Sequence, residues 1–130
     1  MAEWTGWTFM DYCSAGGNNP ISEWYESVLS VQQRADVDAL LRVLRNSRIW
    51  NVTDFRARIQ GREGLSEIRL KSERTQIRLI GRQAPGFRYV LLIGCTHKQQ
   101  IYDPKSCLDT AERRKKEIDR GEASTREHEI

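Results

Sequence analysis

Three short segments with alternating apolar and polar residues constrain the fold most. They cover residues 64–71, 77–80 and 89–95. Successive side chains of a strand point to opposite faces, so the apolar residues of the first segment face one way and Glu67, Arg69 and Lys71 face the other. Arg78 likewise opposes its apolar neighbours. The pattern predicts three antiparallel strands with a cationic face, and the unbroken apolar run at 89–95 favours a central strand covered on both sides.

Two helices are predicted before these strands. Asn19 followed by Pro20 is typical of an N-cap and a first helical residue, and the apolar residues that follow repeat along one helix face. Ser30 with Gln33 three residues later matches a capping box. The apolar residues after it recur at i, i+3, i+4 and i+7, which predicts a second amphipathic helix that ends near Asn46.

The remaining segments complete an α+β order. Residues 7–12 predict a first strand, whereas residues 46–64 favour no single structure. Asp103 and Pro104 repeat the cap-and-proline pattern before a final helix that reaches residue 118. The sequence therefore predicts one domain over residues 1–118: a small antiparallel sheet with its N-terminal and C-terminal helices on one side and the cations on the other. The polar residues 119–130 predict a flexible tail.

Positive charge is concentrated in the middle of the chain. The 130 residues carry a net charge of only +3. Residues 34–98, however, hold 14 Lys and Arg against 6 Asp and Glu, an excess of eight positive charges. Such a one-signed region attracts polyanions, although an ordinary solvated basic surface is the alternative interpretation.

Other features favour a protein of the cytoplasm. No apolar run is long enough to span a bilayer, and the first residues lack the pattern of a signal peptide. The three cysteines, Cys13, Cys95 and Cys107, are odd in number and have no C-x-x-C spacing, which favours reduced thiols packed as small apolar groups. No nucleotide-binding or metal-binding motif is present, so neither a cofactor nor a metal is expected.

Several short motifs, taken in order, resemble a known family. They are WTFMDY at 7–12, NPISEW at 19–24, GLSEIR at 64–69, IRL at 77–79, CTHK at 95–98, YDP at 102–104 and RRKK at 113–116. Together they resemble the RelE/HigB-like toxins of type II toxin-antitoxin systems, in the phage-derived branch. The resemblance covers residues 7–118. It implies a RelE-like α+β fold with its functional cations on the open face of the sheet.

The resemblance also implies a function and partners. Toxins of this family cleave messenger RNA, commonly in the ribosomal A site, and are neutralised by a small antitoxin from the same operon, which we expect here to be of the helix-turn-helix type. The family's functional cations carry over to Arg69, Arg78 and Lys98. The chain departs from the family pattern at Ser66, where an aromatic is usual, at His97, which replaces the first lysine of a pair, and in its longer acidic tail.

The chemistry of RNA cleavage assigns roles to these side chains. Without a metal, the 2′-OH attacks the neighbouring phosphorus, which requires a proton acceptor, positive charge and a proton donor. Arginine supplies only the positive charge because it does not lose its proton, so Arg69 and Arg78 are the candidates for binding phosphate. His97 is the candidate for proton transfer, with Lys98 as a second cation or as the acid or base itself.

Further residues are expected to bind RNA. These are Lys71, Arg74 and Tyr102, of which Tyr102 would stack on a base or donate a proton. Each assignment has an alternative: Arg69 pairs with Glu67, His97 is an ordinary surface residue, or Tyr102 packs in the core. At the level of function, the alternatives are a ParE-like inhibitor of gyrase and a phage-derived protein that binds RNA or a partner without cleaving it.

Overall fold

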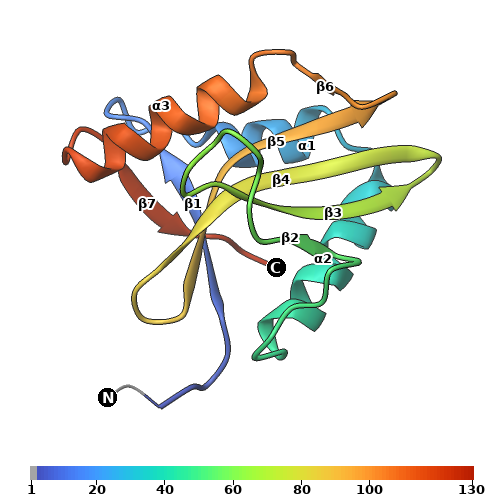
Figure 1. Cartoon of the computed structure of the whole chain (residues 1–130), viewed down its shortest axis with the longest axis horizontal. Coiled ribbons are helices and arrows are strands. Elements are labelled where there is room, and N and C mark those ends of the chain that lie inside the picture. Colours follow the sequence, from blue (N-terminus) through green and yellow to red (C-terminus); the bar gives the residue numbers. More distant parts are fainter. Residues whose placement is uncertain (1–2) are drawn as a thin grey trace.

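The fold is built around a seven-stranded sheet with three helices, and the computed structural model describes residues 3–130 (Figure 1). In chain order the elements are β1 (Thr8–Cys13), α1 (Pro20–Ser27), α2 (Val31–Arg45), β2 (Phe55–Arg56), β3 (Ser66–Ser72), β4 (Thr75–Ala84), β5 (Arg88–Lys98), β6 (Ile101–Asp103), α3 (Cys107–Asp119) and β7 (Ser124–Glu127). The predicted α+β class is therefore present.

The strand order explains how one long strand organises the sheet. The main path is β2-β3-β4-β5-β1-β7, and β6 also pairs with β5. Strands β3, β4 and β5 are antiparallel neighbours, as predicted. Strand β1 pairs with β5 in parallel, which the sequence did not indicate. Strand β5 is thus central, and the sheet is mixed rather than purely antiparallel.

The first two helices begin where the sequence predicts. The Asn19 side chain accepts the backbone N–H of Ser22, and Ser30 forms the complete capping box with Gln33. The last helix differs, because Asp103 is the final residue of β6, paired with Thr96, and α3 begins only at Cys107. No helix within residues 3–130 is both long and apolar enough to cross a membrane.

The helices cover both faces of the sheet, so the prediction of helices on one side only is wrong. Helices α1 and α2 pack with Phe9, Ile68 and Leu79 in one apolar cluster, whereas α3 packs with Val90 and Leu92 in a second. Figure 1 shows α3 and α2 on opposite sides of the strands. The physical reason is that β5 is apolar on both faces and each face must be covered.

An irregularity in β5 sets which side chains reach which cluster. Pairing with β4 passes from Ile80–Ile93 to Gly81–Leu91, so Leu92 is the extra residue of a bulge. Beyond the bulge, Cys95 faces α3 and Gly94 faces α1, where the ring of Trp24 lies against the glycine backbone. The bulge therefore decides that Cys95 and His97 lie on the same face as Arg78.

Residues 119–130 do not form the predicted flexible tail. Residues Ser124–Glu127 make β7, which pairs antiparallel with β1. Beyond β7, the backbone N–H of His128 donates to the carbonyl of Phe9, and Nδ1 of the buried His128 lies 2.8 Å from Oδ1 of Asp11. The prediction failed because these polar residues gain their partners from β1, more than a hundred residues away in the chain.

Candidate functional site

The predicted cations converge where β3, β4, β5 and β6 lie side by side. Arg69 pairs with Arg78, and Arg78 pairs with Cys95, in one row across the strands. The next row runs through Lys71, Gln76, His97 and Tyr102. Directly paired residues share a face of the sheet, so both rows project from the same side. We call this set of side chains, together with Glu67, the sheet-face cluster.

Arg78 is the centre of the sheet-face cluster and is only 8% exposed. One terminal nitrogen donates to the carbonyl of Ile77 at 3.0 Å and to Oε1 of Gln76 at 3.3 Å, and the other lies 3.5 Å from Nδ1 of His97. Its Nε is buried and has no hydrogen-bond partner among the described residues. Burial lowers the pKa of the guanidinium. A buried cation with an unused donor favours the binding of an anion.

A buried carboxylate holds the cluster together from below. Glu67 is 2% exposed and accepts a hydrogen bond of 2.6 Å from the hydroxyl of Tyr102. Its other oxygen lies 3.9 Å from Nε of Arg78. Burial, followed by the hydrogen bond to Glu67, raises the pKa of Tyr102, so the phenol stays protonated. The carboxylate thereby balances the charge of Arg78 and fixes the orientation of Tyr102.

The contacts decide between the alternatives for two residues. The Arg69 guanidinium donates to the carbonyl of Val52 at 2.8 Å, and Glu67 instead contacts Tyr102 and Arg78. Tyr102 is half-buried and directed at Glu67, so its hydroxyl is not free to stack on or donate to a ligand without leaving that bond. His97 is also half-buried, and its ring centroid lies 4.7 Å from that of Tyr102.

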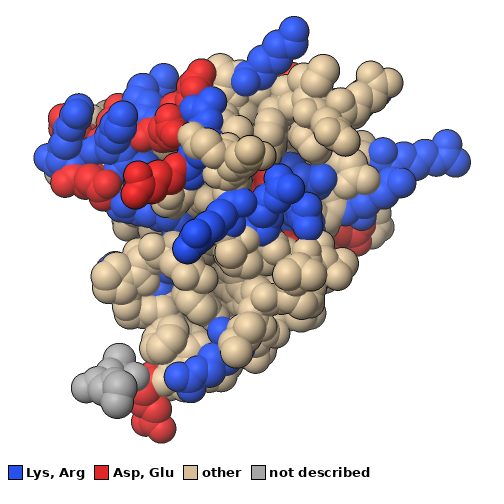
Figure 2. Space-filling view, viewed as in Figure 1, with Lys and Arg blue, Asp and Glu red and all other residues tan. Residues whose placement is uncertain are grey.

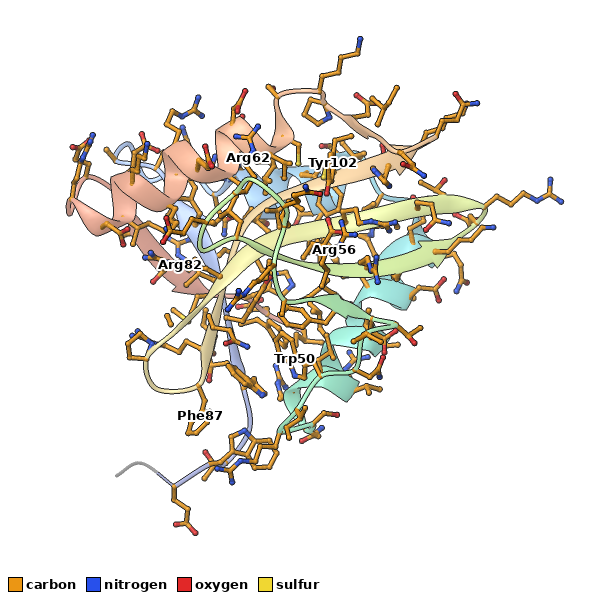
Figure 3. The ribbon with its side chains drawn as sticks, viewed as in Figure 1. Trp50, Arg56, Arg62, Arg82, Phe87 and Tyr102 are labelled. Carbon is orange, nitrogen blue, oxygen red and sulfur yellow. The ribbon has the colours of Figure 1, made fainter. Side chains whose placement is uncertain are left out.

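The cations border an open depression. It has a volume of about 480 Å³ and is lined by Thr53, Asp54, Arg69, Leu70, Lys71, Gln76 and Arg78. Figure 2 shows basic side chains gathered over the middle of the sheet, between the tan surface of the lower strands and the mixed charges of α3. Side chains from β2, β6 and the loop before β3 surround this region in Figure 3. The depression exposes one end of the Arg69–Arg78 row to solvent.

Two of the predicted residues lie outside the sheet-face cluster. Lys98 follows His97 in β5, so its side chain leaves the opposite face, at an exposed position paired with Ile101. Arg74 is exposed in the turn between β3 and β4, where its φ of 64° marks a tight hairpin turn. The structure thus brings together Arg69, Lys71, Arg78, His97 and Tyr102.

The sequence interpretation missed Glu67 and Gln76 as members of the cluster. Glu67 was considered only as an ion-pair partner of Arg69. An acidic side chain on an otherwise basic strand face indicates that Glu67 has a special role. Its partner Tyr102 could not be identified from the sequence, because it is 35 residues away. Gln76 carried no signal, because its role comes from lying between Lys71 and His97 in the sheet.

Two buried cysteine thiols lie under the sheet-face cluster, in surroundings that disfavour their reaction. Sγ of Cys95 and Sγ of Cys107 are 2.7 Å apart, and both residues are fully buried. Contact with Cys107, together with burial, raises the pKa of the Cys95 thiol. The neutral thiol is a poor nucleophile. Within residues 3–130, no group of three or more His, Cys, Asp or Glu side chains is arranged to hold a metal ion.

Comparisons with known proteins give no relative for this arrangement: no family model, no curated protein and no solved structure matches the chain.

Proposed function

We propose that the protein is a RelE/HigB-type toxin that cleaves messenger RNA on the ribosome through attack of a 2′-OH, without a metal. The observation that supports this most is the buried guanidinium of Arg78, which lies 3.5 Å from His97 and is paired in register with Arg69. Two guanidinium groups and an imidazole thus share one face of the sheet, which is the set of groups that the proposed cleavage uses.

The two arginines bind and stabilise the reacting phosphate. Arg69 borders the depression and is held by Val52, while Arg78 borders it from a site with little water and directs its Nε toward Glu67. Negative charge increases on the phosphoryl oxygens when the 2′-OH attacks. A cation in a low-dielectric site stabilises that charge more than one in water, and removal of such a group costs about 10²–10³ in rate.

Proton transfer is assigned to two members of the second row, His97 and Lys71. His97 accepts the proton of the 2′-OH, and Glu67 acts as a positioning residue through Arg78 and Tyr102 rather than by touching RNA. Lys71 lies two strands from His97, across Gln76, at a distance of about 10 Å between strand axes. It is our candidate to protonate the departing 5′ oxygen, since in-line attack places acid and base on opposite sides of phosphorus.

Two partners belong to the proposal. The ribosome presents the messenger RNA in an unstacked form that the shallow depression can reach, and a small antitoxin, expected to be of the helix-turn-helix type, neutralises the toxin. Neither Lys98 nor Arg74 is assigned a catalytic role, because both lie outside the sheet-face cluster.

The test is to induce the protein in bacteria and map the ends of messenger RNA. Cleaved transcripts are expected with the wild type and strongly reduced cleavage with Arg78→Ala and His97→Ala. Arg88→Ala is a matched control, since Arg88 is exposed at the far end of β5. Intact transcripts in growth-arrested cells would contradict the proposal, and DNA damage signalling alongside them would instead identify a gyrase inhibitor.

A further inference from the structure

A basic residue outside the sheet-face cluster shares its face. Strand β2 consists of only Phe55 and Arg56, and Phe55 is buried against Trp50 with 4.9 Å between ring centroids. Because neighbouring side chains of a strand point to opposite faces, Arg56 points away from that core. It pairs with Glu67, so it projects from the same side as Arg69 and Arg78. Figure 3 places it over the middle of the sheet.

Among the described residues, Arg56, like Arg69, has no acidic partner, whereas Arg62 and Arg82 do. Arg62 contacts Asp109 and Glu112, at 2.6 and 3.0 Å, and Arg82 contacts Asp119 at 2.6 Å. Within residues 3–130, no carboxylate lies within ion-pair distance of Arg56. Glu67, opposite to it, already accepts from Tyr102 and faces Arg78. Arg56 and Arg69 lie on adjacent strands, and two such guanidinium groups repel one another unless an anion lies between them.

The elements around the depression leave one direction in which an extended ligand can cross the sheet. On the β5 side, α3 packs over β5 and β4 and forms a wall. On the other side, β2 is the last strand and its Arg56 is exposed. Arg56 is a diagonal neighbour of Arg69, with about 7–8 Å between such positions, so the two long side chains reach neighbouring phosphates of one strand.

We propose that Arg56 binds the phosphate next to the scissile one, and that single-stranded RNA crosses the sheet from β4 toward β2. This inference rests on the proposed function and adds to it a direction for the substrate and a binding residue on β2. Arg56 is assigned no part in proton transfer, because a guanidinium group supplies charge and does not act as an acid or a base.

The test measures how salt weakens the binding of a short, fluorescently labelled single-stranded RNA whose 2′-O-methyl groups block cleavage. For a single strand, each phosphate neutralised contributes about 0.7 to the slope of log affinity against log salt. Arg56→Gln is therefore expected to reduce the slope by about 0.7. Arg88→Gln removes the same charge at the far end of β5. Arg88 pairs there with Ala84, which lies six residues along β4 from Arg78 and about 20 Å away, so this variant is expected to leave the slope unchanged.

The outcomes separate this inference from the proposed function. If Arg69→Gln reduces the slope and Arg56→Gln does not, the path across β2 is wrong and the nuclease proposal stands. If the wild-type protein binds without any salt dependence and leaves cellular transcripts intact, both are wrong. In cells, the inference also expects Arg56→Gln to slow cleavage at unchanged positions. A shift of the cleavage positions would overturn it, because Arg56 would then select the scissile phosphate.

Discussion

At the level of single residues, the arrangement of the sheet-face cluster depends on the buried carboxylate of Glu67. Glu67 is satisfied by Tyr102 on one oxygen and faces Arg78 with the other. Removing one partner of a buried hydrogen bond lowers the free energy of unfolding by more than the bond itself contributes. The remaining polar group stays buried and binds neither water nor protein. The Tyr102 hydroxyl is therefore more important for stability than its half-buried position indicates.

Replacing Tyr102 with phenylalanine tests this point. We expect Tyr102→Phe to lower the free energy of unfolding by about 1–3 kcal/mol, because Glu67 loses the donor to its buried oxygen. Tyr12→Phe is the matched control, since that hydroxyl donates to the more accessible Glu117 and its loss should cost about 1 kcal/mol. Urea denaturation of both variants gives the comparison. Equal losses would mean that Glu67 has access to water.

Residue identity alone showed only part of this site. The alternation within residues 64–71 and 77–80 correctly predicts which side chains of β3 and β4 share a face, because that period is a property of the backbone. It does not predict that Tyr102 meets Glu67 or that His97 shares the face of Arg78. Those contacts depend on how β6 folds back on β5 and on the bulge at Leu92.

At the scale of elements, β7 is the clearest case of structure built by a distant partner. It adds a strand beside β1, and His128 brings an imidazole to the buried carboxylate of Asp11, which also accepts from Asn19. Nδ1 of His128 and Oδ1 of Asp11 are both shielded from solvent. The segment thus closes the edge of the sheet and stabilises a buried acid at the same time.

Loss of the imidazole should destabilise the fold. We expect His128→Ala to reduce the free energy of unfolding by on the order of 3 kcal/mol, because the buried carboxylate of Asp11 then loses the imidazole that contacts its Oδ1. Glu129→Ala changes the exposed next residue and should have little effect. Guanidinium denaturation measures both. If the two variants were equally stable, residues 124–130 would not be part of the folded sheet.

Helix α1 offers a second test, at the place where it meets β5. A Cβ at Gly94 would lie 2.3 Å from ring carbons of Trp24, so Gly94→Ala forces the helix or the indole away. Overpacking of this kind costs about 1–3 kcal/mol. Gly16→Ala, which meets nothing closer than 3.9 Å, is the control. Thermal unfolding should separate them, and an unchanged midpoint for Gly94→Ala would show that α1 does not rest on β5.

Most elements could be predicted from the sequence, but their arrangement could not. The helix caps at Asn19 and Ser30 involve only residues close in the chain, so the first residues of α1 and α2 can be predicted from the sequence. Strand β2 is too short to show a period, and the parallel pairing of β1 with β5 joins residues 80 apart, such as Thr8 and Arg88. Those features follow from packing of the whole chain.

At the scale of the whole molecule, all four tyrosines hold their protons more tightly than in water. Burial is the main cause of the raised pKa in each case: Tyr12, Tyr25, Tyr89 and Tyr102. Above pH of about 10 the unfolded chain releases these protons and the folded chain retains them, so the unfolded state binds fewer protons. Stability that is fully present below pH 10 is therefore lost as the pH rises above it.

The raised pKa values of the tyrosines predict that the protein unfolds at alkaline pH. We expect the free energy of unfolding, measured with urea, to be insensitive to tyrosine ionisation up to pH of about 10 and then to fall, by up to about 1.4 kcal/mol per pH unit for each tyrosine. Tyrosinate absorbance, followed in parallel, should appear only as the protein unfolds. Absorbance that rises near pH 10 while the fold persists would contradict the burial of these phenols.

The proposed function requires that RNA is cut by its own 2′-OH on the sheet-face cluster. The most direct measurement is the chemistry of the ends that induction of the protein leaves on cleaved transcripts. Attack by the 2′-OH produces a 2′,3′-cyclic phosphate, or the 3′-phosphate formed from it, and a 5′-hydroxyl, and the account expects these ends with wild-type protein and their loss with Arg78→Ala. Ends that carry a 5′-phosphate and a 3′-hydroxyl would contradict it, because they require attack by water.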